Sequence, residues 1–122
     1  MELNQGYFDF SKANDSKVYA LDLRNQTIAI ANKSVGISFV IYSGTPVVRV
    51  ALDTNFTDEL VSRHTGGSVV YLVTPELREK SSFKGVIYIW VTSEKSADYY
   101  FSSYTKASNY MGIYSNTYYY NH

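Results

Sequence analysis

The stretch that decides the fold is Gly85-Val86-Ile87-Tyr88-Ile89-Trp90-Val91-Thr92. Two sets of side chains alternate along it, namely the aliphatic residues Ile87, Ile89 and Val91 and the set Val86, Tyr88 and Trp90. Successive side chains of a β-strand point to opposite faces, and β-branched and aromatic residues fit a pleated, half-buried surface. The stretch therefore predicts a strand with one aliphatic face and one largely aromatic face.

Six further stretches are predicted to be short strands separated by polar turns: 18–23, 28–30, 36–43, 47–52, 68–73 and 98–105. The stretch 36–43 is apolar on both faces, which predicts a central strand. Gly44-Thr45 predicts a two-residue hairpin loop between this strand and 47–52, because glycine supplies a positive φ. Short strands at regular spacing, without intervening helices, predict an all-β protein. The expected architecture is an antiparallel β-sandwich of about seven to nine strands, such as a jelly roll.

The sandwich is predicted to span residues 13–105, with a segment on either side that the strand pattern does not explain. Residues 1–12 are predicted to be an N-terminal extended segment, because their aromatic residues have no neighbouring turn that would pair them. Residues 106–122 form a tyrosine-rich C-terminal segment with few aliphatic residues. Within the sandwich, residues 53–63 fit a loop, a short strand or a helical turn. Residues 76–84 are predicted to be a charged loop with room for a helical turn.

The composition excludes several classes of protein. The chain has 122 residues, enough for one domain with a core, and its 11 Lys plus Arg balance 11 Asp plus Glu. A net charge of zero argues against nucleic-acid and anionic-membrane partners, which require an excess of positive charge. The chain has no Cys, so disulfides and thiolate metal sites are excluded. No apolar run is long enough to predict a membrane span, and the first residues lack a signal-peptide pattern.

Two parts of the chain resemble a known family. The opening strand Val18-Tyr19-Ala20-Leu21-Asp22-Leu23 and the closing strands, residues 85–91 followed by Ala97-Asp98-Tyr99-Tyr100-Phe101, resemble the bacterial pre-peptidase C-terminal (PPC) domain. Domains of this family are small β-sandwiches that accompany secreted proteases and other surface proteins. The resemblance therefore implies a PPC-like sandwich and an extracellular or cell-surface location. Where the family has a mid-domain Asp-Leu-Tyr signature, this chain has Ile37-Ser38-Phe39-Val40-Ile41-Tyr42, so no calcium or ligand role is carried over.

Four Asn-x-Ser/Thr sequons occur, at Asn14, Asn25, Asn32 and Asn55. Each lies in a predicted turn or at a strand end, where a bulky glycan would be solvated. Turns favour Asn, Ser and Thr in any case, so composition alone is the alternative explanation. In a secreted protein these four residues are the predicted glycosylation sites.

Little in the sequence supports catalysis, and the chain is predicted not to be an enzyme. The only imidazoles are His64, predicted to be solvated in a polar turn, and the terminal His122. A Gly-x-Ser-x-Gly elbow and a nucleophilic Cys are both absent. No cofactor is predicted. Residues 53–59, Asp-Thr-Asn-Phe-Thr-Asp-Glu, group the oxygen ligands that calcium prefers but lack EF-hand spacing, so a solvated turn is predicted, with calcium as the alternative.

The aromatic residues leave two explanations open. Trp90 and Tyr88 share one predicted strand face, and Tyr100 and Tyr104 are predicted to neighbour them. Such a row most often forms half of a sandwich core, and the alternative is an exposed face that binds sugar rings or an extended protein chain. The tyrosines of the C-terminal segment are predicted to act in binding or assembly: Tyr110, Tyr114, Tyr118, Tyr119 and Tyr120.

Two hypotheses for function follow. The first is a structural subunit of an extracellular filament, coat or surface glycoprotein that assembles by adding its β-prone ends to a neighbour's sheet. Its predicted partners are further copies of the chain or neighbouring surface proteins. The second is a carbohydrate- or protein-binding accessory module of a larger secreted protein, which would use exposed Tyr and Trp side chains.

Overall fold

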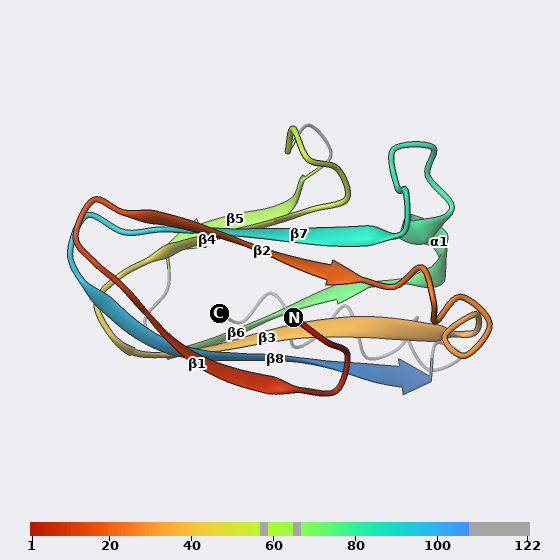
Figure 1. Ribbon diagram of the computed structural model, residues 1–122, viewed down its shortest axis with the longest axis horizontal. Helices are drawn as coiled ribbons and strands as arrows, with labels where there is room; N and C mark the ends of the chain where they lie inside the picture. The colour runs from red at the N-terminus through yellow and green to blue at the C-terminus, as the bar shows by residue number, and fades with distance from the viewer. Residues whose placement is uncertain (57–58, 65–66, 108–122) are drawn as a thin grey trace.

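Eight strands form two four-stranded antiparallel sheets in the computed structural model, which describes residues 1–56, 59–64 and 67–107 (Figure 1). Sheet A has the order β1 (Gly6–Ser11), β8 (Ala97–Ala107), β3 (Lys33–Ser43) and β6 (Gly67–Val73). Sheet B has the order β2 (Ser16–Asp22), β7 (Val86–Thr92), β4 (Val47–Ala51) and β5 (Glu59–His64). The two sheets lie one above the other, which confirms the predicted antiparallel β-sandwich.

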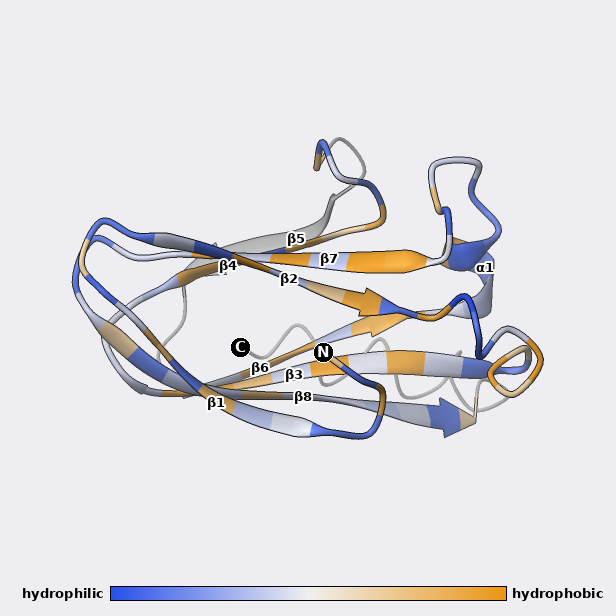
Figure 2. Ribbon diagram, viewed as in Figure 1, coloured by the Kyte–Doolittle hydropathy of each residue, from blue (hydrophilic) through white to orange (hydrophobic). Residues whose placement is uncertain are grey.

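The inner faces of the sheets follow the alternation seen in the sequence. On β7, Ile87, Ile89 and Val91 are fully buried, whereas Tyr88 and Trp90 point outward and are half-buried. Figure 2 shows hydrophobic stretches along β7 and β3. The strand at 85–92 is therefore as predicted, but the interpretation of its aromatic face as core is wrong, because the aliphatic face alone lies between the sheets.

The core of sheet A is aromatic. Phe39 of β3 stacks on Phe101 of β8 with ring centroids 5.3 Å apart, and Tyr99 lies 5.8 Å from Phe39. All three side chains are almost completely buried. The hydroxyl of Tyr71 on β6 donates a hydrogen bond to the carbonyl of Val48 on β4 (3.0 Å), which joins sheet A to sheet B. The central position predicted for residues 36–43 is confirmed, since β3 lies between β8 and β6.

The predicted strand at 28–30 is wrong. The chain between β2 and β3 forms turns whose hydrogen bonds are local, such as Gln26 N–H to the Leu23 carbonyl (2.9 Å) and Ile30 N–H to the Gln26 carbonyl (3.0 Å). Ile30 enters the core at 4% exposure, whereas Ile28 is 93% exposed. Two isoleucines two residues apart imitate the alternation of a strand, but here only Ile30 packs into the core.

The predicted hairpin at Gly44-Thr45 is also wrong, because β3 and β4 belong to different sheets. The positive φ expected at Gly44 is present (81°). A Cβ atom at Gly44 would lie 2.5 Å from the Ser96 carbonyl oxygen. Glycine therefore lets the chain pass close to the β7–β8 turn while it crosses from one sheet to the other.

The N-terminal residues are part of the sandwich rather than a separate extended segment. Gly6–Ser11 forms β1 and pairs along its whole length with β8, so the division predicted at residue 12 does not hold. Asp9 lies at an inward position of β1, which weakens the apolar alternation that predicts a strand. At the C-terminal end of the sandwich, β8 continues to Ala107, past the predicted boundary at 105. Residues 108–122 lie outside the described part of the chain.

Two segments left open by the sequence are resolved. Residues 59–64 form β5 on the edge of sheet B. Pro75–Arg78 forms the single-turn helix α1, where the Thr74 side chain accepts a hydrogen bond from Leu77 N–H (3.2 Å). The Arg78 guanidinium donates hydrogen bonds to the carbonyls of Val73, Ile30 and Lys33, which fastens α1 to the turns before β3. Within the described residues, no helix has the length and apolar character needed to cross a membrane.

Phe39→Ala tests the aromatic core. The substitution removes a fully buried ring and is expected to lower the free energy of unfolding by about 3–5 kcal/mol, through lost transfer energy and a cavity. Urea unfolding followed by fluorescence measures this change. Val18→Ala on the outer face of β2, where Val18 is 59% exposed, is the control and should change the free energy by less than about 0.5 kcal/mol. Equal losses in the two variants would contradict the burial described here.

Candidate functional site

A hollow of about 380 Å³ lies at the β1 edge of sheet A. Its lining is aromatic and acidic: Phe8, Asp9, Phe10, Tyr42, Asp98 and Tyr99. These residues come from three neighbouring strands, so the hollow depends on sheet pairing between segments that are far apart in the sequence. We refer to it as the β1 hollow.

Strand register sets the positions of the side chains in the β1 hollow. Phe10 of β1 and Ser43 of β3 are both register partners of Asp98 on β8. Between Ile41 and Ser43 the β3–β8 register shifts by a β-bulge, so Tyr42 is an extra residue opposite β8. Bulges redirect side chains, and both Tyr42 and Ser43 are exposed here.

The rings around the β1 hollow contact one another. Phe8 stacks on Tyr42 with centroids 6.2 Å apart and planes at 21°, and it lies 4.7 Å from the ring of Tyr100. Phe8 is 75% exposed, Tyr42 61% and Phe10 43%. Large apolar side chains that gather on a surface at such exposure are typical of binding sites, whereas single exposed ones are ordinary.

Two glycines allow tyrosine rings to lie against sheet A. A Cβ atom at Gly6 would lie 1.7 Å from the Tyr100 hydroxyl oxygen, and a Cβ atom at Gly36 would lie 2.3 Å from the ring of Tyr104. The rings of Tyr100 and Tyr104 thus occupy the space that side chains at these positions would take. Both half-buried rings extend the aromatic surface from the β1 hollow along β8.

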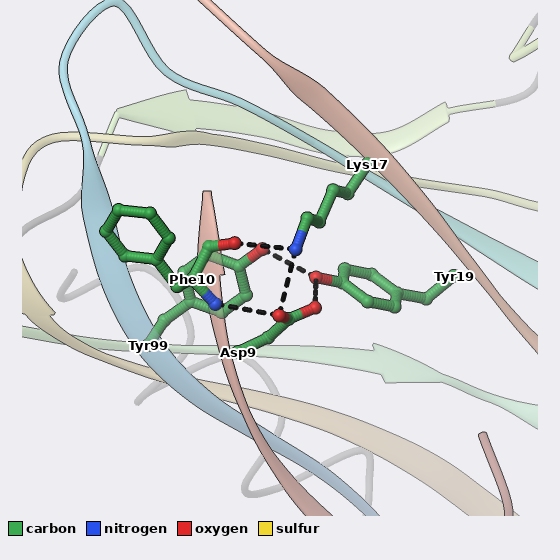
Figure 3. Close-up of polar contacts among 5 residues, drawn as sticks. All are labelled: Asp9, Phe10, Lys17, Tyr19 and Tyr99. Atoms are coloured by element: carbon green, nitrogen blue, oxygen red, sulfur yellow. Dashed lines mark hydrogen bonds and ion pairs between the residues drawn. The ribbon is translucent and has the colours of Figure 1, made fainter. Parts of the chain in front are cut away.

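A network of hydrogen bonds includes two residues that line the β1 hollow, Asp9 and Tyr99, and joins the two sheets (Figure 3). Asp9 of β1 accepts hydrogen bonds from Lys17 Nζ (2.9 Å) and from the Tyr19 hydroxyl (2.5 Å), both on β2. The Tyr19 oxygen also lies 2.5 Å from the Tyr99 hydroxyl. Since Tyr19 gives its one proton to the carboxylate, Tyr99 is the donor in that pair. Lys17 also donates to the Phe10 carbonyl (2.6 Å), so the network fixes β1 at the edge of the β1 hollow.

These contacts change the acidity of the groups involved. Burial raises the pKa of Asp9, but hydrogen bonds from Tyr19 and Lys17 outweigh it, so the pKa lies below its usual range. The hydrogen bond to Asp9 raises the pKa of Lys17. Burial, together with the neighbouring carboxylate, raises the pKa of Tyr19 well above its usual range. The network is therefore a carboxylate, an ammonium group and two neutral phenols at pH 7, which suits a structural tie between the sheets.

The predicted aromatic row is divided between opposite faces of the sandwich. Tyr100 and Tyr104 lie on sheet A, whereas Trp90 and Tyr88 lie on the outer face of sheet B. The Arg49 guanidinium lies 4.4 Å from the centroid of the Trp90 ring, and the ring of Phe56 lies 5.5 Å from it. The Trp90 ring is thus already partly covered by side chains of its own chain. The predicted role of Trp90 and Tyr88 in binding stays a prediction.

Phe8, Phe10 and Tyr42 were not predicted as site residues from the sequence. In β1 the inward positions are Tyr7, Asp9 and Ser11, and the residues between them are exposed. Because two of these inward residues are polar, the sequence lacks the apolar alternation that would predict this strand. The predicted tyrosines of the C-terminal segment lie outside the described residues: Tyr110, Tyr114, Tyr118, Tyr119 and Tyr120.

All four sequon asparagines are exposed: Asn14, Asn25, Asn32 and Asn55. None of them lines the β1 hollow. Ser34, the hydroxyl residue of the Asn32 sequon, is fully buried at the start of β3, so a folded chain would not present that sequon whole. Glycosylation at these sites stays a prediction.

The candidate metal and histidine positions are only partly described. The predicted oxygen cluster at 53–59 includes residues 57 and 58, which lie outside the described part of the chain. Among the residues that the structure does describe, no group of three or more His, Asp or Glu side chains is placed to hold a metal ion. His64 ends β5, where its register partner is Val47, instead of lying in a turn. Calcium binding stays an untested alternative.

Comparison with solved structures supports the fold. The chain is similar to the crystal structure of the pre-peptidase C-terminal domain of collagenase from Bacillus anthracis, with a TM-score of 0.56 and 14% sequence identity. The similarity covers 84% of this chain and 90% of that chain. No family model matches the sequence, and no curated protein matches it. At this identity the similarity concerns the fold, and it confirms the PPC-like sandwich that the sequence predicts.

Asp9→Asn tests the network between the sheets. Because folding lowers the pKa of Asp9, its ionised form stabilises the protein above the ordinary carboxyl pKa of 3.8, and this contribution is lost as the pH falls through the lowered value. Asp9→Asn should therefore lower the free energy of unfolding by about 1–2 kcal/mol at pH 7. The difference from wild type should shrink between about pH 5 and pH 3, as urea unfolding at each pH would measure.

Glu94→Gln, which changes an exposed acid in the β7–β8 turn, is the matched control and should show no comparable effect at pH 7. If the gap between wild type and Asp9→Asn stayed constant down to pH 3, the ionised carboxylate would not be what stabilises the fold.

Proposed function

We propose that the chain is a non-catalytic binding module of a larger secreted protein and that its ligand docks on the aromatic face of sheet A. The observation that carries this proposal is the group of exposed rings at the β1 hollow, formed by Phe8, Phe10 and Tyr42. Concave sites lined by apolar rings with a few polar groups are the usual form of binding sites. The PPC-like fold supports an accessory role, since the similar solved structure is one domain of a collagenase.

The chemistry of the β1 hollow favours binding over catalysis. Its lining has two carboxylates, but Asp9 is held in the network with Lys17 and Tyr19. None of the six lining residues is a His, Cys or Ser that could act as a nucleophile or as a base near pH 7. The exposed rings, in contrast, supply apolar contact area for a ligand.

The filament hypothesis loses one of its two supports. It requires an N-terminal strand that is free to join a neighbour, but β1 is paired with β8 and tied to β2 through Asp9. The C-terminal tyrosines lie outside the described residues, so assembly through them stays a prediction. The accessory-module hypothesis is therefore the one that we adopt, with an extracellular location and glycosylation as parts of the same proposal.

Phe8→Thr and Tyr42→Thr test this proposal. The chain would be screened by co-sedimentation against insoluble extracellular polymers, both polysaccharides and fibrous proteins. Each substitution should weaken retention on the bound polymer by about tenfold, because central aromatic residues dominate the energy of such interfaces. Threonine keeps the β-propensity of both positions, so folding should be preserved, as circular dichroism would check.

Val18→Thr is the matched control, because Val18 has a similar exposure on the outer face of sheet B. Its retention should equal that of the wild type. Retention that survives both sheet A substitutions but is lost in Trp90→Ala would move the site to sheet B and contradict the proposal.

A further inference from the structure

Asp98 gives the β1 hollow a carboxylate that forms no ion pair with a basic side chain in the described part of the chain. The Asp98 carboxylate accepts a hydrogen bond from Ser43 Oγ (2.9 Å). The backbone N–H of Asp98 donates a hydrogen bond to Ser43 Oγ (3.1 Å). Asp9 on β1 and Asp22 on β2, in contrast, are each paired with a basic side chain. Among the described residues, Asp98 has no such ion pair. It is exposed, so its charge is available to a ligand.

The rings beside Asp98 suit a cation. Aromatic faces attract ammonium and guanidinium groups, and a nearby carboxylate adds to that attraction. On the opposite face of the sandwich, the chain makes such a cation–π contact with its own side chains. The Arg49 guanidinium lies 4.4 Å from the centroid of the Trp90 ring and 5.4 Å from that of Phe56. The β1 hollow has rings and a carboxylate, but none of its six lining residues is a Lys or an Arg.

We propose that the β1 hollow binds the cationic side chain, in the first place that of arginine, of an extended polypeptide. This inference rests on the proposed function and names the class of its partner. Phe8 and Phe10 on β1 and Tyr42 on β3 stand on either side of β8, which carries Asp98. A planar guanidinium can lie against such rings and still form paired hydrogen bonds with a carboxylate, which an ammonium group cannot do.

The surface next to the β1 hollow explains why the partner is a chain rather than a small cation. Beyond the hollow, the half-buried side chains of Tyr100, Val40 and Tyr104 continue along the outer face of sheet A. An extended peptide can place one basic side chain in the hollow and rest its neighbouring residues on this surface. The net charge of the protein is zero, so recognition depends on the local carboxylate rather than on long-range attraction.

The test is a titration of the isotope-labelled full chain, followed by nuclear magnetic resonance, with acetyl-Gly-Gly-Arg-Gly-Gly-amide. The amide signals of Phe8, Phe10, Tyr42 and Asp98 should shift. The same peptide with citrulline, a neutral analogue of arginine with nearly the same shape, should bind about 5- to 20-fold more weakly. This comparison uses the wild-type protein, so it does not depend on how any variant folds.

Asp98→Asn should reduce the affinity for the arginine peptide to about that for the citrulline peptide, and Asp15→Asn, an exposed acid in the β1–β2 turn, should leave it unchanged. Equal affinities for the two peptides, or shifts confined to other surfaces, would overturn the cation proposal. In either case, polymer retention that still depends on Phe8 and Tyr42 would leave the proposed function standing. Loss of that dependence would overturn both.

Discussion

The structure depends on the burial of one face of β8 between the two sheets. Tyr99 and Phe101 point inward and pack against Phe39, so the residues between and beside them must point outward. Asp98 and Tyr100 are placed on the surface by this alternation alone. A slip of one residue in the pairing of β8 would exchange the two sets, burying a carboxylate and exposing the core rings. The energy that fixes the core therefore also fixes the β1 hollow.

The edge strand β1 is where core and surface meet. Its inward Asp9 is partly buried at a tolerable cost because Lys17 and Tyr19 of the other sheet satisfy the carboxylate. An inward-pointing charge on an edge strand also discourages pairing with another chain. The inward Asp9, whose hydrogen bonds hold the strand that carries Phe8 and Phe10, thus argues against assembly through this edge.

Much of the fold could be predicted from local pattern. Alternation at 85–92 and 98–105 predicted the two strands correctly, since a period of two needs no knowledge of the partner strand, but it did not show which face of 85–92 is buried. The errors came from features that a period of two does not report. Ile28 and Ile30 imitate a strand, and Gly44 was assigned to a hairpin although its neighbour is Ser96 of another turn. Phe8 and Tyr42 meet across β8 only because of its register with β1 and the β3 bulge, so the site was not visible in the sequence.

Hydroxyl-radical footprinting of the full chain, read residue by residue by mass spectrometry, tests the central claim most directly. That claim is that one face of β8 and its neighbours forms the core while the other forms an open aromatic surface. Phe8 and Tyr42 are predicted to be oxidised rapidly, and Tyr99, Phe101 and Phe39 to be protected until the protein unfolds. Protection of Phe8 and Tyr42 to the same degree as Tyr99 would contradict the account, because the β1 hollow would then not be an open surface.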